Sequence, residues 1–141
     1  MDLPDVNVLV YAFRPDSQWH QMARRLLDDL SNGDRPFAVA SLVISGFLRV
    51  TTMPGMAKVP PEKPAALEFV RVLLSGQNAR LVQPGRAHMD QFLRLARMAG
   101  IHGNAIPDAY LAALAIEHDC EFVTLDHGFG CFPGLRWRLL A

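Results

Sequence analysis

The sequence lacks the features that mark membrane and secreted proteins. Its longest mostly apolar stretch, residues 37–48, is shorter than the ~20 residues that a transmembrane helix needs. The N-terminal MDLPDVN has no basic segment of the kind that opens a signal peptide. These absences predict a cytoplasmic protein that does not insert into membranes.

Cysteine is scarce, and an excess of charge of either sign is missing. Cys120 and Cys131 are not spaced as C-x-x-C, and the five histidines add no zinc pattern. The 14 basic residues balance the 14 acidic residues, so no net charge draws the chain to nucleic acid or anionic lipid. Any anion-binding surface must therefore be local.

The sequence does contain an alternation of short apolar strands and amphipathic helices along 141 residues, which predicts one domain spanning 1–141. The expected strands are the start of 3–10, then 37–40, 79–84, 121–126 and 135–140. The expected helices are 16–32, 41–52, 65–75, 88–100 and 106–118, with a proline-rich loop at 54–64. This order favours an α/β sandwich with a mostly parallel central sheet flanked by helices.

Helix starts and buried faces can also be predicted. Asp16 or Ser17 is expected to cap the first long helix and Ser41 the next, because their side chains can accept a backbone N–H. Apolar residues at helical spacing are expected to face the core. These inward residues include Leu67, Met89 and Leu93.

Three aspartates coincide with the ends of predicted elements. Asp5 follows the first short strand, Asp126 follows the strand FVTL, and Asp108 opens the helix that leads into that strand. Side chains at the carboxyl ends of parallel strands gather at one edge of the sheet. Carboxylates that share such an edge repel one another unless a cation lies between them. Mg²⁺, which prefers oxygen ligands, fits this need. Asn7 can add an amide oxygen or hydrogen-bond the Asp5 carboxylate.

Each aspartate also has a simpler interpretation. Asp5 can be a turn or cap residue, and Asp126 in LDHGFG can be a turn aspartate. Asp108 can be a carboxylate favoured by the helix dipole, with Pro107 at the first helical position. What favours a metal site is that all three aspartates coincide with predicted element ends of one α/β sheet.

The same residues carry a family resemblance along nearly the whole chain. The sequence resembles PIN-domain ribonucleases, specifically VapC toxins of toxin–antitoxin pairs. The resemblance implies a parallel sheet flanked by helices, Mg²⁺- or Mn²⁺-dependent cleavage of single-stranded segments in structured RNA of the transfer or ribosomal type, a homodimer and a VapB antitoxin. The stretches that carry it are DVNVLVYAF (5–13), GFLRVTTMP (46–54), GNAIPDAYLAALAIEH (103–118) and VTLDHGFGCFPGLRW (123–137).

The resemblance assigns roles to single residues. Asp5, Asp108 and Asp126 match the acidic metal ligands of the family and are the expected catalytic residues. Thr124 matches the T-x-D position and Asn7 the polar position after the first acid.

One position departs from the pattern. Many PIN domains have a glutamate in the helix after the second strand, where this chain has Gly46, or Ser45 in a shifted register. Asn104 is a candidate to supply a polar group instead. Arg14 and Arg49 are candidate RNA phosphate contacts, with a solvated surface or an internal ion pair as the alternative.

Two other functions stay open at this stage. The missing glutamate favours a catalytically weak PIN fold that binds RNA or a protein partner. A phosphatase of the haloacid dehalogenase type needs a second aspartate two residues after the first, and here that residue is Asn7. Hydrolysis of a small phosphate ester would favour the phosphatase.

Overall fold

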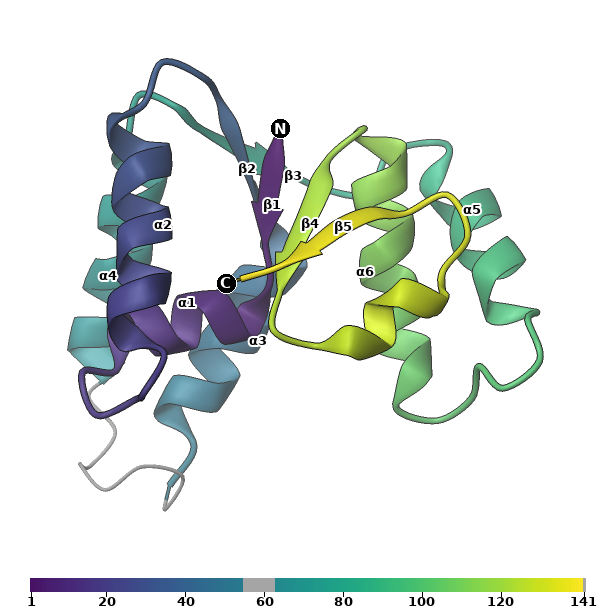
Figure 1. The fold of residues 1–141 in the computed structure, drawn as a ribbon, viewed down its shortest axis with the longest axis horizontal. Helices are drawn as coiled ribbons and strands as arrows, with labels where there is room; N and C mark the ends of the chain where they lie inside the picture. The colour runs from purple at the N-terminus through teal and green to yellow at the C-terminus, as the bar shows by residue number, and fades with distance from the viewer. Residues whose placement is uncertain (55–62, 141) are drawn as a thin grey trace.

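A computed structural model of the chain describes residues 1–54 and 63–140. Short strands alternate with helices, as the sequence predicts (Figure 1). The strands are β1 (Asp2–Pro4), β2 (Phe37–Ala40), β3 (Ala79–Val82), β4 (Glu121–Thr124) and β5 (Arg136–Leu139). The helices are α1 (Val6–Phe13), α2 (His20–Asn32), α3 (Ser41–Thr52), α4 (Lys63–Ser75), α5 (His88–Ala96) and α6 (Ala105–Glu117), with a short 3-10 helix, η1 (His127–Cys131).

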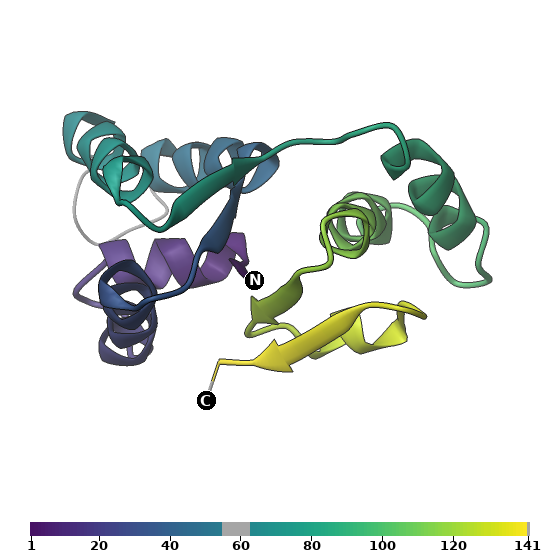
Figure 2. The same ribbon diagram turned by 90° about the horizontal axis from the view of Figure 1, so that it is seen from above.

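The paired strands are parallel and form two hydrogen-bonded groups. β4 pairs with β1 on one side and β5 on the other, and β2 pairs with β3. β1 packs beside β2, which places the two groups side by side. Figure 2 shows α1, α2 and α4 on one side of the strands and α5 and α6 on the other. The predicted α/β sandwich with a parallel sheet is confirmed.

β2 and α6 both contribute to the hydrophobic core. All four residues of β2 are buried, and so are six of the 13 residues of α6, each of them an alanine or a leucine. A helix that is apolar on nearly every face belongs in an interior, and its small alanines let it lie close to the strands. Among residues 1–54 and 63–140, no helix has the length and apolar character needed to cross a bilayer.

The predicted start of the first long helix is wrong. α2 begins at His20, with Trp19 as its N-cap and no side-chain capping bond. The Ser17 hydroxyl oxygen accepts the Trp19 N–H at 3.1 Å, two residues along the chain. This local bond stabilises a turn in place of a helix start, which is the usual competition offered by serine. Ser41 is likewise the first residue of α3 rather than its cap, which is Ala40.

Part of the predicted inward face of two helices is also wrong. Met89 and Leu93 of α5 are 51% and 41% exposed, and Leu67 of α4 is 48% exposed. In α5 the buried residues are instead His88 and Leu95. The His88 ring nitrogen Nε2 lies 2.9 Å from the Tyr110 carbonyl oxygen, which satisfies its polar group inside the core. The prediction treats His88 as a polar, outward residue, and this displaces the predicted buried face of α5 by one residue.

The predicted loop at 54–64 falls mostly outside the described residues. Where the description resumes, Lys63 and Pro64 form the start of α4, two residues earlier than predicted. Proline fits there because the first N–H groups of a helix have no intrahelical partner.

Candidate functional site

Asp5 lies where β1 passes into α1. It has extended backbone angles and is the N-cap of α1, with Oδ1 accepting the Val6 N–H at 2.6 Å. Its own N–H donates to the Val123 carbonyl at 2.8 Å, which continues the β1–β4 pairing. Asp5 is only 7% exposed. The cap role and a buried carboxylate at a strand end are therefore both present.

Thr124, the last residue of β4, holds the other oxygen of Asp5. Its hydroxyl donates to Asp5 Oδ2 at 2.6 Å and accepts the Asp126 N–H at 3.0 Å. Asn7 Nδ2 donates to the same hydroxyl oxygen at 3.4 Å. Because the Thr124 proton goes to Asp5, the Asn7 amide must turn its nitrogen towards Thr124. Its Oδ1 is then buried without a hydrogen-bond partner among the described residues.

Asp108 stands in the first turn of α6, as predicted. The helix begins earlier than expected, at Ala105, so Pro107 is its third residue and not its first. Asp108 is half-buried and lies in the wall of the same pocket as Asp5. The helix dipole favours a carboxylate at this position, and the pocket gives it a second role.

Asp126 is the exposed member of the set. It is the N-cap of η1, and its Oδ1 accepts the Gly128 N–H at 2.7 Å. This is the turn role that the sequence left open. Its backbone N–H also joins Asp126 to Thr124, so the chain after β4 is tied to the Asp5 network.

The three carboxylates act on one another electrostatically. Burial raises the pKa of Asp5 to about 6, with the charges of Asp108 and Asp126 adding to the rise and hydrogen bonds from Thr124 and Val6 opposing it. Burial also raises the pKa of Asp108, and the charge of Asp126 adds to it. The site therefore concentrates negative charge that it does not itself neutralise.

The donor groups fit a hard divalent cation. Carboxylate oxygens and the unpartnered Asn7 Oδ1 are the ligands that Mg²⁺ prefers, and Mg²⁺ usually keeps several waters. In the described part of the chain, however, no three His, Cys, Asp or Glu side chains are placed closely enough to hold a metal ion alone. Asp5 and Asp108 are therefore the direct candidates, with Asp126 and Asn7 acting at longer range.

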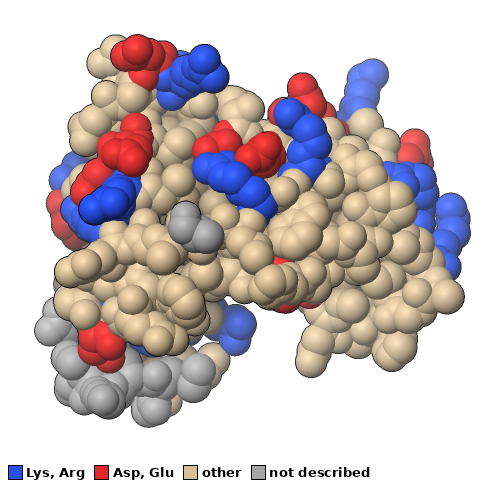
Figure 3. Space-filling model, viewed as in Figure 1, with Lys and Arg blue, Asp and Glu red and all other residues tan. Residues whose placement is uncertain are grey.

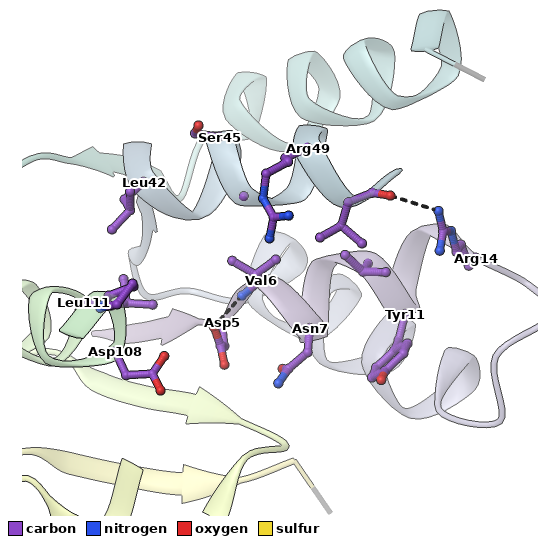
Figure 4. Close-up of a pocket in the computed structure, with 14 residues that line it drawn as sticks. Asp5, Val6, Asn7, Tyr11, Arg14, Leu42, Ser45, Arg49, Asp108 and Leu111 are labelled. Atoms are coloured by element: carbon purple, nitrogen blue, oxygen red, sulfur yellow. Dashed lines mark hydrogen bonds between the residues drawn. The ribbon is translucent and has the colours of Figure 1, made fainter. Parts of the chain in front are cut away.

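A pocket of about 680 Å³ opens beside these groups. Figure 4 shows the Asp108 carboxylate pointing towards Asp5, with Asn7 next along α1. Arg49 reaches into the pocket from α3, on the side opposite the acids. The pocket thus has an acidic side, which carries Asp5 and Asp108, and an opposite side on α3, which carries the positive charge of Arg49.

The α3 side has no acid, and the structure gives a reason for the glycine found there. A Cβ placed on Gly46 would lie 2.9 Å from Val6 Cγ2, closer than side chains normally approach. Gly46 therefore lets α3 lie directly on α1 beside Asp5. Ser45 is exposed and also borders the pocket.

The structure brings two of the remaining candidate residues to the pocket and leaves the third outside it. Arg14 and Arg49 both line the pocket, and Arg14 Nη2 also donates to the Val50 carbonyl at 3.3 Å. Asn104 is exposed at the N-cap of α6 and makes no capping bond. It does not line the pocket that holds Asp108, so its predicted role has no support in the geometry.

The family model for the PIN domain matches residues 3–133. The chain belongs to the PIN-domain family. Within it, the VapC ribonuclease Mb2897 of Mycobacterium bovis is 40% identical over 134 residues, covering 95% of this chain and 91% of the relative. Ribonuclease VapC25 of Mycobacterium tuberculosis is 38% identical, covering 96% of each chain. The VapC resemblance seen in the sequence is confirmed.

Solved PIN-domain structures show the same fold. VapBC2 from Rickettsia felis, bound to a DNA fragment from its promoter, has a TM-score of 0.71 at 18% identity and covers 97% of this chain and 96% of that chain. Mycobacterium tuberculosis VapC20, described as a sarcin-ricin loop cleaving toxin, has a TM-score of 0.71 at 13% identity and covers 96% of this chain and 99% of that chain. At these identities the likeness shows the fold alone.

Sequence reasoning missed the apolar part of this PIN-domain pocket. Val6, Val10, Leu42, Val50 and Leu111 line it together with the polar groups. One signal was available, because Leu111 lies three residues after Asp108 and so shares its helix face. The others depend on how closely α1 and α3 approach, which no local pattern predicts.

Proposed function

We propose that this chain is a metal-dependent endoribonuclease toxin that hydrolyses phosphodiester bonds in structured RNA of the transfer or ribosomal type. The observation that carries the proposal is the buried Asp5 carboxylate, 7% exposed, with its pKa raised to about 6 beside two further carboxylates. A protein gains nothing in stability from such repulsion, whereas a cation-binding enzyme needs it. The VapC relatives, which are named as ribonucleases, support the same reaction.

Each residue of the site has a distinct task in this proposal. Asp5 and Asp108 would bind Mg²⁺, or Mn²⁺ in its place, with Asp126 acting directly or through water. Thr124 fixes the Asp5 carboxylate by its hydroxyl, and Asn7 offers its free Oδ1 to the cation or to a water bound there. When bound, the metal supplies Lewis-acid stabilisation of the phosphoryl charge and lowers the pKa of a water. The reaction then needs no nucleophilic side chain.

RNA binding in this proposal is local. The net charge of the chain is zero. On the face shown in Figure 3, acidic and basic side chains are interspersed, chiefly along the upper edge and the flanks. Arg14 and Arg49, which line the pocket, are therefore the proposed phosphate contacts. Affinity should depend on these few contacts rather than on a broad basic surface.

The proposed biological setting follows the relatives. Several solved structures with this fold are toxin–antitoxin complexes of VapB and VapC chains. We propose a VapB-type antitoxin as the neutralising partner, a homodimer as the working assembly and a single PIN domain over residues 1–141. Gel filtration and copurification with the antitoxin test the assembly.

The decisive experiment is cleavage of a pool of transfer and ribosomal RNAs by purified, antitoxin-free protein. Discrete cuts are expected with Mg²⁺ or Mn²⁺, none with a chelator, and none with Asp108→Asn. Asp90→Asn is the matched control, because Asp90 is an exposed carboxylate in the first turn of α5, and it should cut normally. Absence of cuts by folded wild-type protein with either metal would contradict the proposal.

One observation favours a second function. The α3 side carries Gly46 and no carboxylate, and among the described residues no group of three acids is close enough to hold a metal alone. A PIN fold that binds RNA or a protein partner without cutting would keep the pocket and lose the reaction. Such a binding-only protein would leave the RNA intact in the cleavage experiment. If RNA is its ligand, it would bind that RNA equally with Mg²⁺ and with chelator.

A further inference from the structure

Arg138 of β5 binds two carboxylates that belong to two other strands. Its Nη1 donates to Glu121 Oε1 at 2.8 Å, and its Nη2 donates to Asp2 Oδ2 at 2.9 Å. Because β4 lies between β5 and β1, the Arg138 side chain crosses β4 to reach β1 (Figure 1). We call Asp2, Glu121 and Arg138 the three-strand clamp. It joins β5 to the short strand that ends just before Asp5.

The two acids of the clamp stand beside each other. Asp2 and Glu121 are partners in the parallel register of β1 and β4. Like charges on paired residues of neighbouring strands destabilise the pairing. Among the described residues, Arg138 is the only cationic group within ion-pair distance of either acid. Without its guanidinium, the two carboxylates would repel each other at the start of β1.

β1 has few other bonds to resist such a repulsion. It is three residues long, and it packs beside β2 without pairing with it. The Asp5 N–H points to β4, where it meets the Val123 carbonyl. Since successive N–H groups of a strand point to opposite sides, position 4 faces β2, and Pro4 has no N–H to donate there. Among the described strands, β1 is therefore paired with β4 alone.

We propose that Arg138 is a positioning residue for the metal ligand Asp5. By cancelling the repulsion between Asp2 and Glu121, it keeps β1 in register with β4. Asp5 follows β1 directly, and both its N–H and its carboxylate are bonded to β4. A displacement of β1 therefore moves the Asp5 carboxylate away from the Thr124 hydroxyl that fixes it. The inference rests on the proposed function, because it assigns Arg138 to the same metal site.

Arg136 provides a matched comparison on the same strand. It lies two residues before Arg138, on the same face of β5, and pairs with Asp119 at 2.9 Å. The Asp119 side chain is 94% exposed, and isolated exposed pairs contribute little to stability. This pair includes no residue of β1. Arg136→Gln thus removes an arginine and an ion pair of similar length from β5, and it leaves the three-strand clamp intact.

The first test follows β1 without metal. Amide hydrogen exchange is measured on the full-length protein with chelator, at the Asp5 and Glu121 N–H groups. Each donates to a carbonyl across the β1–β4 pairing at 2.8 Å. Arg138→Gln should speed exchange at both groups about tenfold relative to the amides of β2, because the pairing opens locally. Arg136→Gln should leave this ratio unchanged, and urea unfolding shows that each variant folds.

The second test measures the consequence for the metal site. Mn²⁺ alone is titrated into each variant by calorimetry, without RNA. Contacts that support a metal ligand usually change metal affinity about 10- to 100-fold, and the clamp acts one step further away, through β1. Arg138→Gln should therefore weaken Mn²⁺ binding about three- to tenfold, whereas Arg136→Gln should bind like wild type.

A double variant tests repulsion as the cause. Arg138→Gln combined with Glu121→Gln removes one of the two repelling charges together with the arginine. It should recover most of the Mn²⁺ affinity and of the slow exchange at Asp5 that Arg138→Gln loses. In the cleavage assay, Arg138→Gln should raise the Mg²⁺ concentration for half-maximal cutting, with the rate at saturation close to wild type.

The outcomes keep this inference and the proposed nuclease apart. Exchange and Mn²⁺ affinity that change no more in Arg138→Gln than in Arg136→Gln overturn the positioning role, even where wild-type protein cuts RNA. Faster exchange with unchanged Mn²⁺ affinity overturns it too, as does a double variant no better than Arg138→Gln alone. Mn²⁺ binding by wild-type protein without any cutting of RNA overturns the nuclease but not the positioning role. Absence of Mn²⁺ binding by wild-type protein overturns both.

Discussion

Two carboxylates of this chain are both largely shielded from water and have opposite surroundings. Asp5 is 7% exposed, and the Glu117 side chain is 9% exposed. Both oxygens of Glu117 accept backbone N–H groups, from Gly85 at 2.7 Å and Ala87 at 2.9 Å, and His118 Nε2 lies 3.5 Å away. Asp5 has two hydrogen bonds as well, but the charges acting on it are those of two other aspartates.

The comparison teaches that burial alone does not identify a functional acid. Glu117 ties the loop before α5 to the end of α6, and a Cβ on Gly85 would lie 2.8 Å from Glu117 Oε2 and force that carboxylate to shift. Its negative charge is matched by donors that the fold supplies. The charge of Asp5 is repelled by the neighbouring carboxylates, and under the proposed function a bound cation would neutralise it.

The largest effect is expected from Asp5→Asn, which removes the central charge and keeps the shape. Metal-dependent RNA cleavage should fall at least about 1,000-fold, because a bound metal lowers the activation barrier by several kcal/mol. The measurement is the initial cleavage rate at saturating Mg²⁺. Glu117→Gln is the control and should cut at the wild-type rate at a temperature where both proteins are folded. An equal loss in both variants would break the comparison.

The pH dependence of stability should come next in size. The Asp5 pKa rises from 3.8 in the unfolded chain to about 6 in the fold. Between these values the folded chain binds a proton that the unfolded chain has lost, so stability falls as pH rises from about 4 to about 6. The loss amounts to about 3 kcal/mol.

Urea unfolding with chelator present measures this loss, and Asp5→Asn should flatten the curve. Mg²⁺ should recover stability above pH 6, because it binds the ionised carboxylate of the folded chain only. A wild-type curve that does not fall between pH 4 and 6 would contradict the raised pKa.

The contrast also shows which parts of the site a sequence can predict. Asp5 and Asp108 come together in one pocket, as predicted, because Asp5 follows the carboxyl end of β1 and the first turn of α6 brings Asp108 to the same place. The partner of Asp5 was predicted only as a motif position, and the structure makes Thr124 a donor to its carboxylate. Gly46 depends on the distance between two helices, and Glu117 on a loop that meets α6 from 30 residues away. These contacts are tertiary, and no local spacing encodes them.

A smaller effect is expected from Thr124→Val, which keeps the shape and removes the hydroxyl. Asp5 Oδ2 then loses its donor, and the Asp126 N–H loses its acceptor. Such supporting contacts usually change metal affinity about 10- to 100-fold. The Mg²⁺ concentration for half-maximal cleavage should rise by that factor, with little change in the rate at saturation. Thr124→Ser keeps the hydroxyl and should stay close to wild type, whereas equal shifts in both variants would point to packing.

The smallest effect is expected from Glu117→Gln, and it concerns the fold alone. One glutamate oxygen is replaced by an NH₂ group, so either the Gly85 or the Ala87 N–H faces a donor and loses its bond. The expected loss is about 1–2 kcal/mol of unfolding free energy, since a hydrogen bond to a charged group is replaced by a mismatch. Urea unfolding measures it, and hydrogen exchange at Gly85 and Ala87 should rise. Because Glu117 already has its donors, Mg²⁺ should stabilise Glu117→Gln as much as wild type and Asp5→Asn much less. If Mg²⁺ stabilised Glu117→Gln less than wild type, the two carboxylates would belong to one coupled network, and the separation between a structural and a metal-binding acid would fail.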